Sequence, residues 1–131
     1  MKIEDFERIT ADLKKRRIPT EVKKVVSTML DKQAEEIVVL KLKGISDITD
    51  YMVICHGNSN RQNSAVSSEI KKVLSKEHKA KAFGVEGERE ADWILLDYVD
   101  YVVHIFAAQT RKKYSLEKLW MDAKRYNFYV D

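Results

Sequence analysis

Two pairs of aspartates have the spacing that most suggests catalysis in this chain. Asp47 and Asp50 lie three residues apart, and so do Asp97 and Asp100. Carboxylates that hold a pair of catalytic metal ions must converge on one place. Residues three apart on one strand point to opposite faces, because strand side chains alternate. The second pair could converge across a tight hairpin, but no glycine-rich phosphate loop accompanies it. We therefore predict no catalytic residue, no cofactor and no enzyme.

Thiol and imidazole groups give a similarly weak indication of a metal site. Cys55 is the only cysteine, so an internal disulfide and a multi-cysteine zinc site are both excluded. Its neighbour His56 points to the other face of a strand, which excludes a Cys–His dyad from these two residues. His78 and His104 stand at unrelated spacings. We predict no metal ligands.

Residues 93–106 predict a β-hairpin with two chemically different faces. If Tyr98-Val99 is a two-residue turn, alternation separates an apolar face that includes Ile94 and Leu96 from a second face. The second face carries, in facing pairs, Asp97 with Asp100, Leu95 with Val102, and Trp93 with His104. Tryptophan beside acids is typical of a protein-docking surface. If the sheet is covered on both sides, Trp93 is instead part of a core.

The net charge of +3 hides a strong asymmetry along the chain. From Glu86 to Asp100 there are six carboxylates and one arginine, a net charge of −5. Residues 14–17 and 111–113 form basic clusters. The acidic segment favours a basic protein partner, and the basic segments could contact RNA or be simple solvated faces.

The elements that must position these residues alternate between helical and strand periodicity. Pro19 ends a first helix, Thr20 is a candidate N-cap, and Ser59 with Gln62 forms a capping box. The expected helices cover 4–17, 20–30, 59–74 and 115–123, and the expected strands cover 37–42, 51–56, 82–85, 93–97 and 100–106. Trp120 lies on the apolar stripe of the last helix, which indicates core packing. This order predicts an α/β fold with a mixed five-stranded sheet flanked by helices.

One domain is expected from the length of 131 residues. Residues 1–19 are interpreted as a basic N-terminal extension with a short helix, and residues 20–131 as a single α/β domain. No apolar run approaches the roughly 20 residues that cross a bilayer, and the first residues lack the apolar core of a signal peptide. We expect a cytoplasmic protein that does not bind membranes.

Several motifs in order along the chain carry a resemblance to a known family. They are Asp47-x-Thr49-Asp50-Tyr51-x-Val53-Ile54, Ser59-Asn60-Arg61-Gln62, Glu86-Gly87, Trp93-x-Leu95-Leu96-Asp97-Tyr98, Asp100, Val102-Val103-His104-Ile105-Phe106 and Arg111-x-x-Tyr114-x-Leu116-Glu117-x-Leu119-Trp120. Together they resemble the ribosomal silencing factor (RsfS, or Iojap) family over about residues 20–123.

This resemblance implies a translation repressor without catalysis. Family members bind the large ribosomal subunit through its ribosomal protein fourteen and block association with the small subunit. Mitochondrial relatives serve large-subunit biogenesis, and some members form homodimers. The family fold is similar to nucleotidyltransferases without a working active site. Carried onto this sequence, the expected partner-binding residues are Trp93, Leu95, Asp97, Tyr98 and Asp100, with Glu86 and Tyr114 as further candidates.

Departures from the family pattern and two other functions remain open. Val99 and Ala91 stand where the family usually has glycine, so the turn after Asp97 is expected to be of an unusual type. Cys55-His56 replaces residues that are usually small or hydroxylic. The alternative functions are a nucleotide-binding, nucleotidyltransferase-like enzyme and an RNA-binding domain that uses residues 14–17. The same basic segment could also contact ribosomal RNA in a silencing factor.

Overall fold

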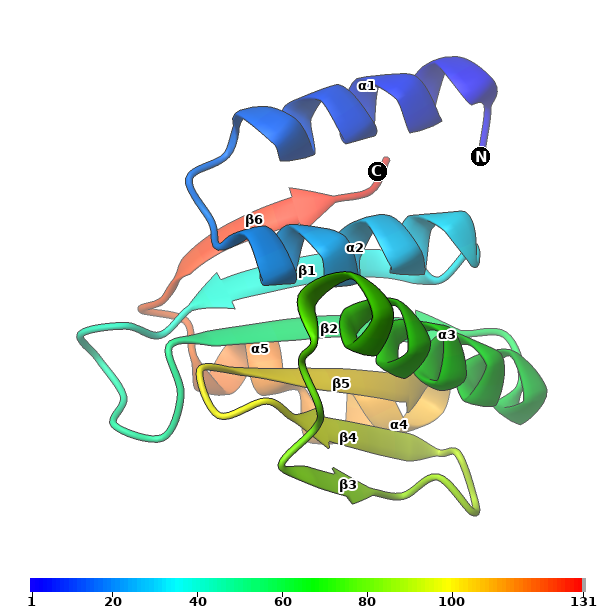
Figure 1. Ribbon diagram of the computed structural model, residues 1–131, viewed down its shortest axis with the longest axis vertical. Helices are drawn as coiled ribbons and strands as arrows, with labels where there is room; N and C mark the ends of the chain where they lie inside the picture. Colours follow the sequence, from blue (N-terminus) through cyan, green and yellow to red (C-terminus); the bar gives the residue numbers. More distant parts are fainter. Residues whose placement is uncertain (131) are drawn as a thin grey trace.

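A computed structural model describes residues 1–130 as five helices and six strands (Figure 1). In chain order these are α1 (Ile3–Lys15), α2 (Thr20–Asp31), β1 (Glu35–Lys41), β2 (Tyr51–Gly57), α3 (Asn60–His78), β3 (Gly84–Glu86), β4 (Trp93–Asp97), β5 (Tyr101–Ala107), α4 (Ala108–Tyr114), α5 (Leu116–Leu119) and β6 (Lys124–Phe128).

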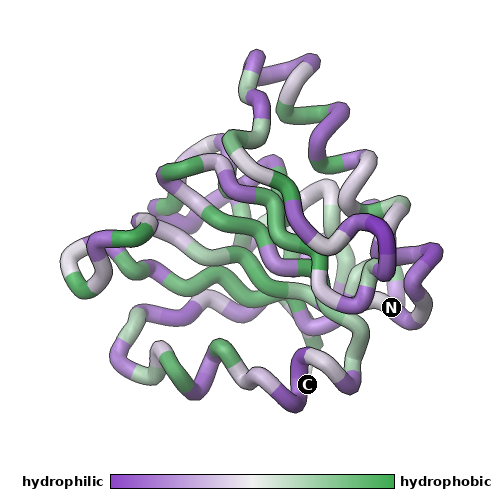
Figure 2. Tube along the Cα trace, turned by 90° about the horizontal axis from the view of Figure 1, so that it is seen from below, coloured by the Kyte–Doolittle hydropathy of each residue, from purple (hydrophilic) through white to green (hydrophobic). Residues whose placement is uncertain are grey.

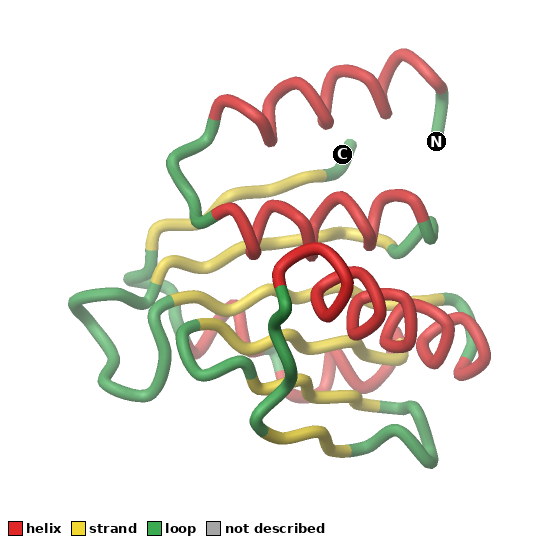
Figure 3. Tube along the Cα trace, in the orientation of Figure 1, coloured by secondary structure: helices red, strands yellow, loops and turns green. Residues whose placement is uncertain are grey.

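The strands form one mixed sheet in the order β3-β4-β5-β2-β1-β6 (Figure 3). Strands β2 and β5 run parallel, and the other neighbours are antiparallel. The predicted mixed α/β sheet is confirmed, but the predicted number of five strands is wrong. The missed strand is β6, whose inward residues are only Tyr126 and Phe128. Two apolar positions are too few to reveal a strand that exists because it pairs with β1.

Both faces of the sheet are covered by helices, and each face has its own apolar core. Helices α2 and α3 lie in front of the sheet in Figure 1, while α4 and α5 lie behind it. The larger core includes Val25, Val53 and Ile105, and the smaller one includes Val38, Ile54 and Phe106. Figure 2 shows hydrophobic stretches along the strands and more hydrophilic segments on the outer helices. No helix within residues 1–130 is both long enough and apolar enough to span a bilayer.

The predicted N-cap residue is correct for α3 and wrong for α2. The Ser59 hydroxyl accepts the Gln62 backbone N–H at 3.1 Å, so the predicted N-cap of α3 is confirmed. The Gln62 side chain accepts the Asn58 N–H at 2.6 Å, one residue earlier than a capping box requires. Thr20 is not the N-cap of α2, because Pro19 takes that place and Thr20 is the first helical residue.

The predicted helix over residues 115–123 is confirmed only in part, because α5 begins directly after Ser115 but ends at Leu119. Ser115 has a φ of +44° and separates two short helices, α4 and α5. Its hydroxyl donates to the Lys112 carbonyl at 2.8 Å instead of capping a following helix. Trp120 follows α5 and packs against the smaller core, which confirms its interpretation as a packing residue.

Helix α1 lies within the segment that the sequence set apart as a basic extension. Ile9 and Leu13 are buried and belong to the larger core, so one side of this helix is packed against the rest of the protein. Figure 1 shows α1 beside the edge strand β6, at one end of the sheet. The basic residues at its end are exposed.

Candidate functional site

The β4–β5 hairpin has the predicted faces but not the predicted register. Asp97 lies opposite Val102, Leu95 opposite His104, and Trp93 opposite Phe106. Each partner is therefore two residues later than expected. Strand side chains alternate with a period of two, so this shift leaves every residue of both strands on its predicted face. Asp100 is the exception, because it belongs to the turn.

The turn is longer than two residues because Asp97 organises it. The Asp97 carboxylate accepts the Val99 N–H at 2.8 Å, and the Tyr101 carbonyl accepts the Tyr98 N–H at 3.0 Å. Asp100 donates its N–H to the Tyr98 carbonyl at 2.9 Å, and Val99 has a φ of +73°. The unusual turn expected at Val99 is confirmed. A β-branched residue in this conformation is strained, and glycine adopts it freely.

A loop from the other half of the sequence holds this turn in place. The Thr49 hydroxyl donates to the Val99 carbonyl at 2.9 Å. The Asp100 carbonyl accepts the N–H groups of Asp50 and Tyr51. One aspartate of each pair, Asp50 and Asp100, therefore meets the other through the backbone at one end of the sheet, and within residues 1–130 no metal-binding group results.

Three strands place some of the proposed binding residues on one sheet face. Antiparallel pairing puts Glu86 of β3 beside Leu95 and, in turn, His104. Asp97 lies two positions from Leu95 on the same side of β4. Trp93 lies at the other end of this strand, next to Tyr114 from α4, with ring centroids 4.7 Å apart. The structure therefore brings Glu86, Trp93, Leu95, Asp97 and Tyr114 together on one side of the hairpin.

Trp93 is part of a packed layer rather than an exposed anchor. It is half-buried and packs against the smaller core. The centroid of the Phe106 ring is 4.9 Å away, and α4 covers part of the indole through Tyr114. The expectation that Trp93 lies outside the core is therefore wrong, because helices cover both faces of the sheet. Tyr114 remains about half exposed at the margin of this layer.

His104 forms the polar centre of the layer. The Trp93 indole N–H donates to Nδ1 of His104 at 3.0 Å. Since an indole nitrogen only donates, Nδ1 accepts and the proton of the neutral ring lies on Nε2. That nitrogen is buried without a hydrogen-bond partner. Burial lowers the pKa of His104 to about 4, so the ring is neutral at pH 7.

Tyr98 and Asp100 do not share the face of the other candidates. The Tyr98 ring packs against the larger core and stacks on Tyr101, with centroids 5.1 Å apart. Its hydroxyl is buried without a hydrogen-bond partner, and burial raises its pKa. Asp100 is exposed in the turn. A direct contact between a partner and the Tyr98 hydroxyl would therefore need a rearrangement.

The acidic segment is only partly available to a partner. Glu88 accepts hydrogen bonds from Lys71 and Ser67 of α3, and these bonds lower its pKa.

The loop backbone before β4 is tightly constrained. Gly87 has a φ of +80°, and a Cβ there would lie 1.9 Å from the Trp93 carbonyl oxygen. The backbone must therefore pass very close to β4 at this point. Ala91 has a φ of +59°, a conformation that glycine adopts more easily than alanine.

Arg111 is a buried, multiply hydrogen-bonded arginine that was not among the predicted site residues. Its side chain is buried, donates to the His56 ring at 3.0 Å and forms an ion pair with Glu117 at 3.3 Å. The family motif includes Arg111 and Glu117 and leaves Lys112 and Lys113 variable, which was the available signal, but the charge pattern alone shows Arg111 only as the first member of a basic cluster. His56 and Cys55 do point to opposite faces, as predicted, with Cys55 in the larger core.

The described residues offer little for nucleophilic or metal chemistry. Burial raises the pKa of Cys55 to about 12, so its thiol stays protonated at pH 7. Within residues 1–130, no three histidine, cysteine or carboxylate side chains are grouped so that they could hold a metal ion. What the hairpin side presents is an aromatic layer with acidic residues beside it. The fold and this site thus define a mixed α/β domain with a candidate protein-binding face.

Comparisons with known proteins agree on the family. Residues 15–130 match the family model described as ribosomal silencing factor during starvation. Ribosomal silencing factor RsfS from Halalkalibacterium halodurans is 47% identical over 98 residues, covering 75% of this chain and 83% of that protein. The Bacillus subtilis protein of the same name is 47% identical over 93 residues, covering 71% and 78%. The chain belongs to the ribosomal silencing factor family.

More distant similarities extend to organelles and to solved structures. The mouse protein called mitochondrial assembly of ribosomal large subunit protein 1 is 32% identical over 99 residues, which cover 73% of this chain and 43% of that protein. A crystal structure from Bacillus halodurans has a TM-score of 0.68 at 43% identity, covering 76% of this chain and 91% of the other. A Chromobacterium violaceum structure has a TM-score of 0.71 at 24% identity, covering 100% and 95%, and shows a shared fold.

Proposed function

We propose that this protein represses translation by binding the large ribosomal subunit through ribosomal protein fourteen and blocking association with the small subunit. The observation that carries this proposal is the family match over residues 15–130. The names of the relatives point to ribosome silencing and to large-subunit assembly. These names describe regulatory factors rather than enzymes.

The hairpin side is the proposed docking face. Ribosomal proteins are basic, and Glu86 and Asp97 offer negative charge beside the half-buried Leu95. Complementary charge speeds encounter and sets register, while well-packed aromatic and apolar groups supply most of the affinity. Trp93 and Tyr114 form the aromatic margin of this face.

Two further candidates, Tyr98 and Asp100, belong to the turn that borders this face. Asp100 is exposed there and could meet the partner directly. Tyr98 is assigned a positioning role, because its ring packs inward next to Tyr101. We also assign to the basic residues 14–17 a contact with ribosomal RNA.

The first experiment follows sedimentation of the purified protein with isolated large subunits, and its binding to isolated ribosomal protein fourteen. Small subunits are then added. We expect co-sedimentation with the large subunit, binding to ribosomal protein fourteen and fewer joined ribosomes. Absence of binding to either would refute the proposal, and a nucleotide titration would then test the enzyme alternative. Sedimentation of the free protein tests the homodimer that the resemblance implies.

The variants for this experiment must leave the hairpin folded. Trp93→Ala would open a cavity in the smaller core, and Asp97→Lys would remove the acceptor that organises the turn. Asp97→Asn keeps an oxygen for the Val99 N–H while it removes the charge. Glu86→Lys reverses an exposed charge on the edge strand.

We expect Asp97→Asn and Glu86→Lys each to weaken large-subunit binding at least about tenfold, near 1.4 kcal/mol. Glu69→Lys on α3 is the matched charge control and should bind as the wild type does. Normal binding by both folded hairpin variants would rule out this face as the docking surface.

A further inference from the structure

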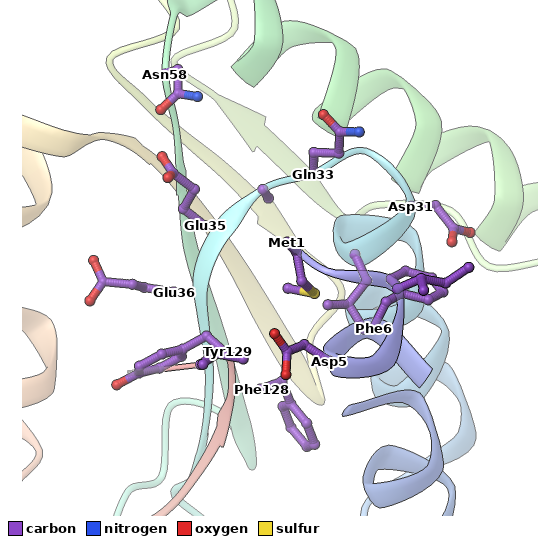
Figure 4. Close-up of a pocket in the computed structure, with 14 residues that line it drawn as sticks. Met1, Asp5, Phe6, Asp31, Gln33, Glu35, Glu36, Asn58, Phe128 and Tyr129 are labelled. Carbon is purple, nitrogen blue, oxygen red and sulfur yellow. The ribbon is translucent and has the colours of Figure 1, made fainter. Parts of the chain in front are cut away.

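A groove lies at the edge of the molecule remote from β3 and β4, where α1 passes over β6 and the beginning of β1. It has a volume of about 720 Å³. Figure 4 shows the side chains of α1, β1 and the residues after β6 around it. Strand β6 is at one end of the sheet order and β3 at the other, so this groove is separate from the proposed docking face.

The inner wall of the groove is apolar. Leu30, Ala34 and Phe128 belong to the larger core and form its floor, and Phe6 of α1 packs against the same core. Ile3 also lines the groove and is 72% exposed. Large exposed apolar side chains beside an apolar floor are typical of interaction sites, and the groove between them has room for a side chain of a partner.

The rim carries four carboxylates, from Asp5, Asp31, Glu35 and Glu36. The groove-lining side chains within residues 1–130 include no lysine or arginine, and the lining residue Met1 adds the cationic N-terminal amino group.

Nearby cations offset this charge only in part. Arg8 lies 3.3 Å from Asp5 in an exposed ion pair, which water and salt screen. His56 Nε2 lies 3.7 Å from both Glu35 and Glu36. Burial and the neighbouring Arg111 lower the pKa of His56, so at pH 7 it does not neutralise these glutamates.

We propose that this groove docks a basic peptide segment of a partner protein, with an apolar side chain of that segment inserted between α1 and β1. Negative charge on the rim repels RNA and anionic lipid and attracts lysine or arginine. The apolar floor requires at least one apolar anchor in the same segment. Residues 1–14 fall outside the stretch matched by the family model, so α1 gives this chain a surface beyond the matched domain.

The test uses the full-length protein and a seven-residue peptide that alternates lysine with leucine, blocked at both ends. Backbone amide signals of the ¹⁵N-labelled protein are followed during titration. We expect the largest shifts at Gln33, Ala34 and Phe128. A glutamate–leucine peptide and a lysine–serine peptide of equal length should each bind at least tenfold more weakly. Equal binding by either peptide, or shifts confined to residues 86–100, would overturn the proposal.

A pair of charge reversals provides the matched comparison. Asp31→Lys with Glu36→Lys should weaken binding of the lysine–leucine peptide at least tenfold. Asp31 is exposed at the end of α2, where a lysine also suits the helix dipole, so the fold should persist. Glu69→Lys with Asp122→Lys changes the net charge equally away from the groove and should have no effect. Equal loss in the two double variants would show a nonspecific charge effect and overturn the assignment.

Discussion

At the scale of single residues, the Trp93–His104 hydrogen bond places two polar groups inside an otherwise apolar layer. The bond satisfies the indole N–H and Nδ1, but Nε2 remains buried without a partner. An unsatisfied buried polar group costs about 1–3 kcal/mol, and a charge there would cost more. The layer therefore requires a neutral imidazole, which couples its stability to pH.

The pH dependence of unfolding should reveal this coupling. The pKa of His104 is about 4 in the folded protein and 6.5 when unperturbed. Between these values the unfolded chain binds more protons, so the free energy of unfolding falls as pH decreases. From pH 7.5 to 5 this contribution is about 2 kcal/mol. His104→Asn keeps an acceptor for Trp93 and should flatten the dependence, measured by urea unfolding.

A control separates His104 from the other titrating groups. Burial also lowers the pKa of His56, which adds a loss in the same direction. That loss is common to the wild type and the His104 variant, so their difference reports His104 alone. An unchanged slope in His104→Asn would contradict the prediction.

Val99 stores strain at the tip of the hairpin. A non-glycine residue with a φ of +73° loses about 1–3 kcal/mol, while glycine costs about 0.5–1 kcal/mol in chain entropy. We expect Val99→Gly to stabilise the protein by about 1 kcal/mol and to raise Tm by about 3–5 °C. Val85→Gly, in the regular strand β3, should lower Tm instead. Calorimetry checks both, and a lower Tm for Val99→Gly would mean that the turn is not strained.

At the scale of elements, α4 and α5 depend on one buried arginine for their attachment. These helices are short, and helices of four to seven residues have little stability of their own. Arg111 links α4 to His56 of β2, to the Glu35 carbonyl at 3.4 Å and to Glu117 of α5. The same attachment holds Tyr114 against Trp93.

Arg111→Met should destabilise the protein by about 3 kcal/mol, because it leaves Glu117 largely buried without its cation. Adding Glu117→Gln should recover part of the loss, since the second substitution removes the unpaired charge. Urea unfolding measures both changes. Lys112→Met, next to Arg111 but exposed, is the control and should change stability by less than about 0.5 kcal/mol. A similarly small effect of Arg111→Met would show that the ion pair contributes little.

At the scale of the whole molecule, opposite charges occupy different parts of the surface. The segment 86–100 is acidic, whereas residues 14–17 at the end of α1 are basic and exposed. Sheet order places these regions toward opposite edges. The hairpin can therefore face a basic protein while the basic C-terminal end of α1, at the opposite end of that helix from the acidic groove, faces an anionic surface.

Replacing Lys14, Lys15 and Arg17 by glutamine tests the proposed ribosomal RNA contact. Arg16 is left unchanged because it pairs with Asp12 at 3.1 Å. We expect severalfold weaker large-subunit binding at low salt and a salt dependence shallower by up to about two units of slope. Sedimentation across a salt series measures this, with Lys72→Gln, Lys76→Gln and Lys81→Gln as an equal charge change elsewhere. A slope that matches the wild type would rule out the contact.

The sequence by itself determined the local features whose physics is local. Alternation assigned the residues of β4 and β5 to the correct faces, and the Ser59 cap located the start of α3. Ordered motifs were sufficient to indicate the ribosomal silencing factor family, which the comparisons confirm. The mixed sheet also followed, because β3 and β4 are joined by a loop too short for a parallel crossover.

Only the tertiary structure decided what depends on contacts between distant segments. Strand β6 exists through its pairing with β1, and Arg111 is buried because β1 and β2 supply its partners. The hairpin turn extends beyond two residues because the side chains of Thr49 and Asp97 form hydrogen bonds with the backbone of Val99. Trp93 became a packing residue because α4 covers that face, a fact that no periodicity in β4 could reveal. Burial of this kind is a property of the assembled layers, and sequence spacing reports only the faces.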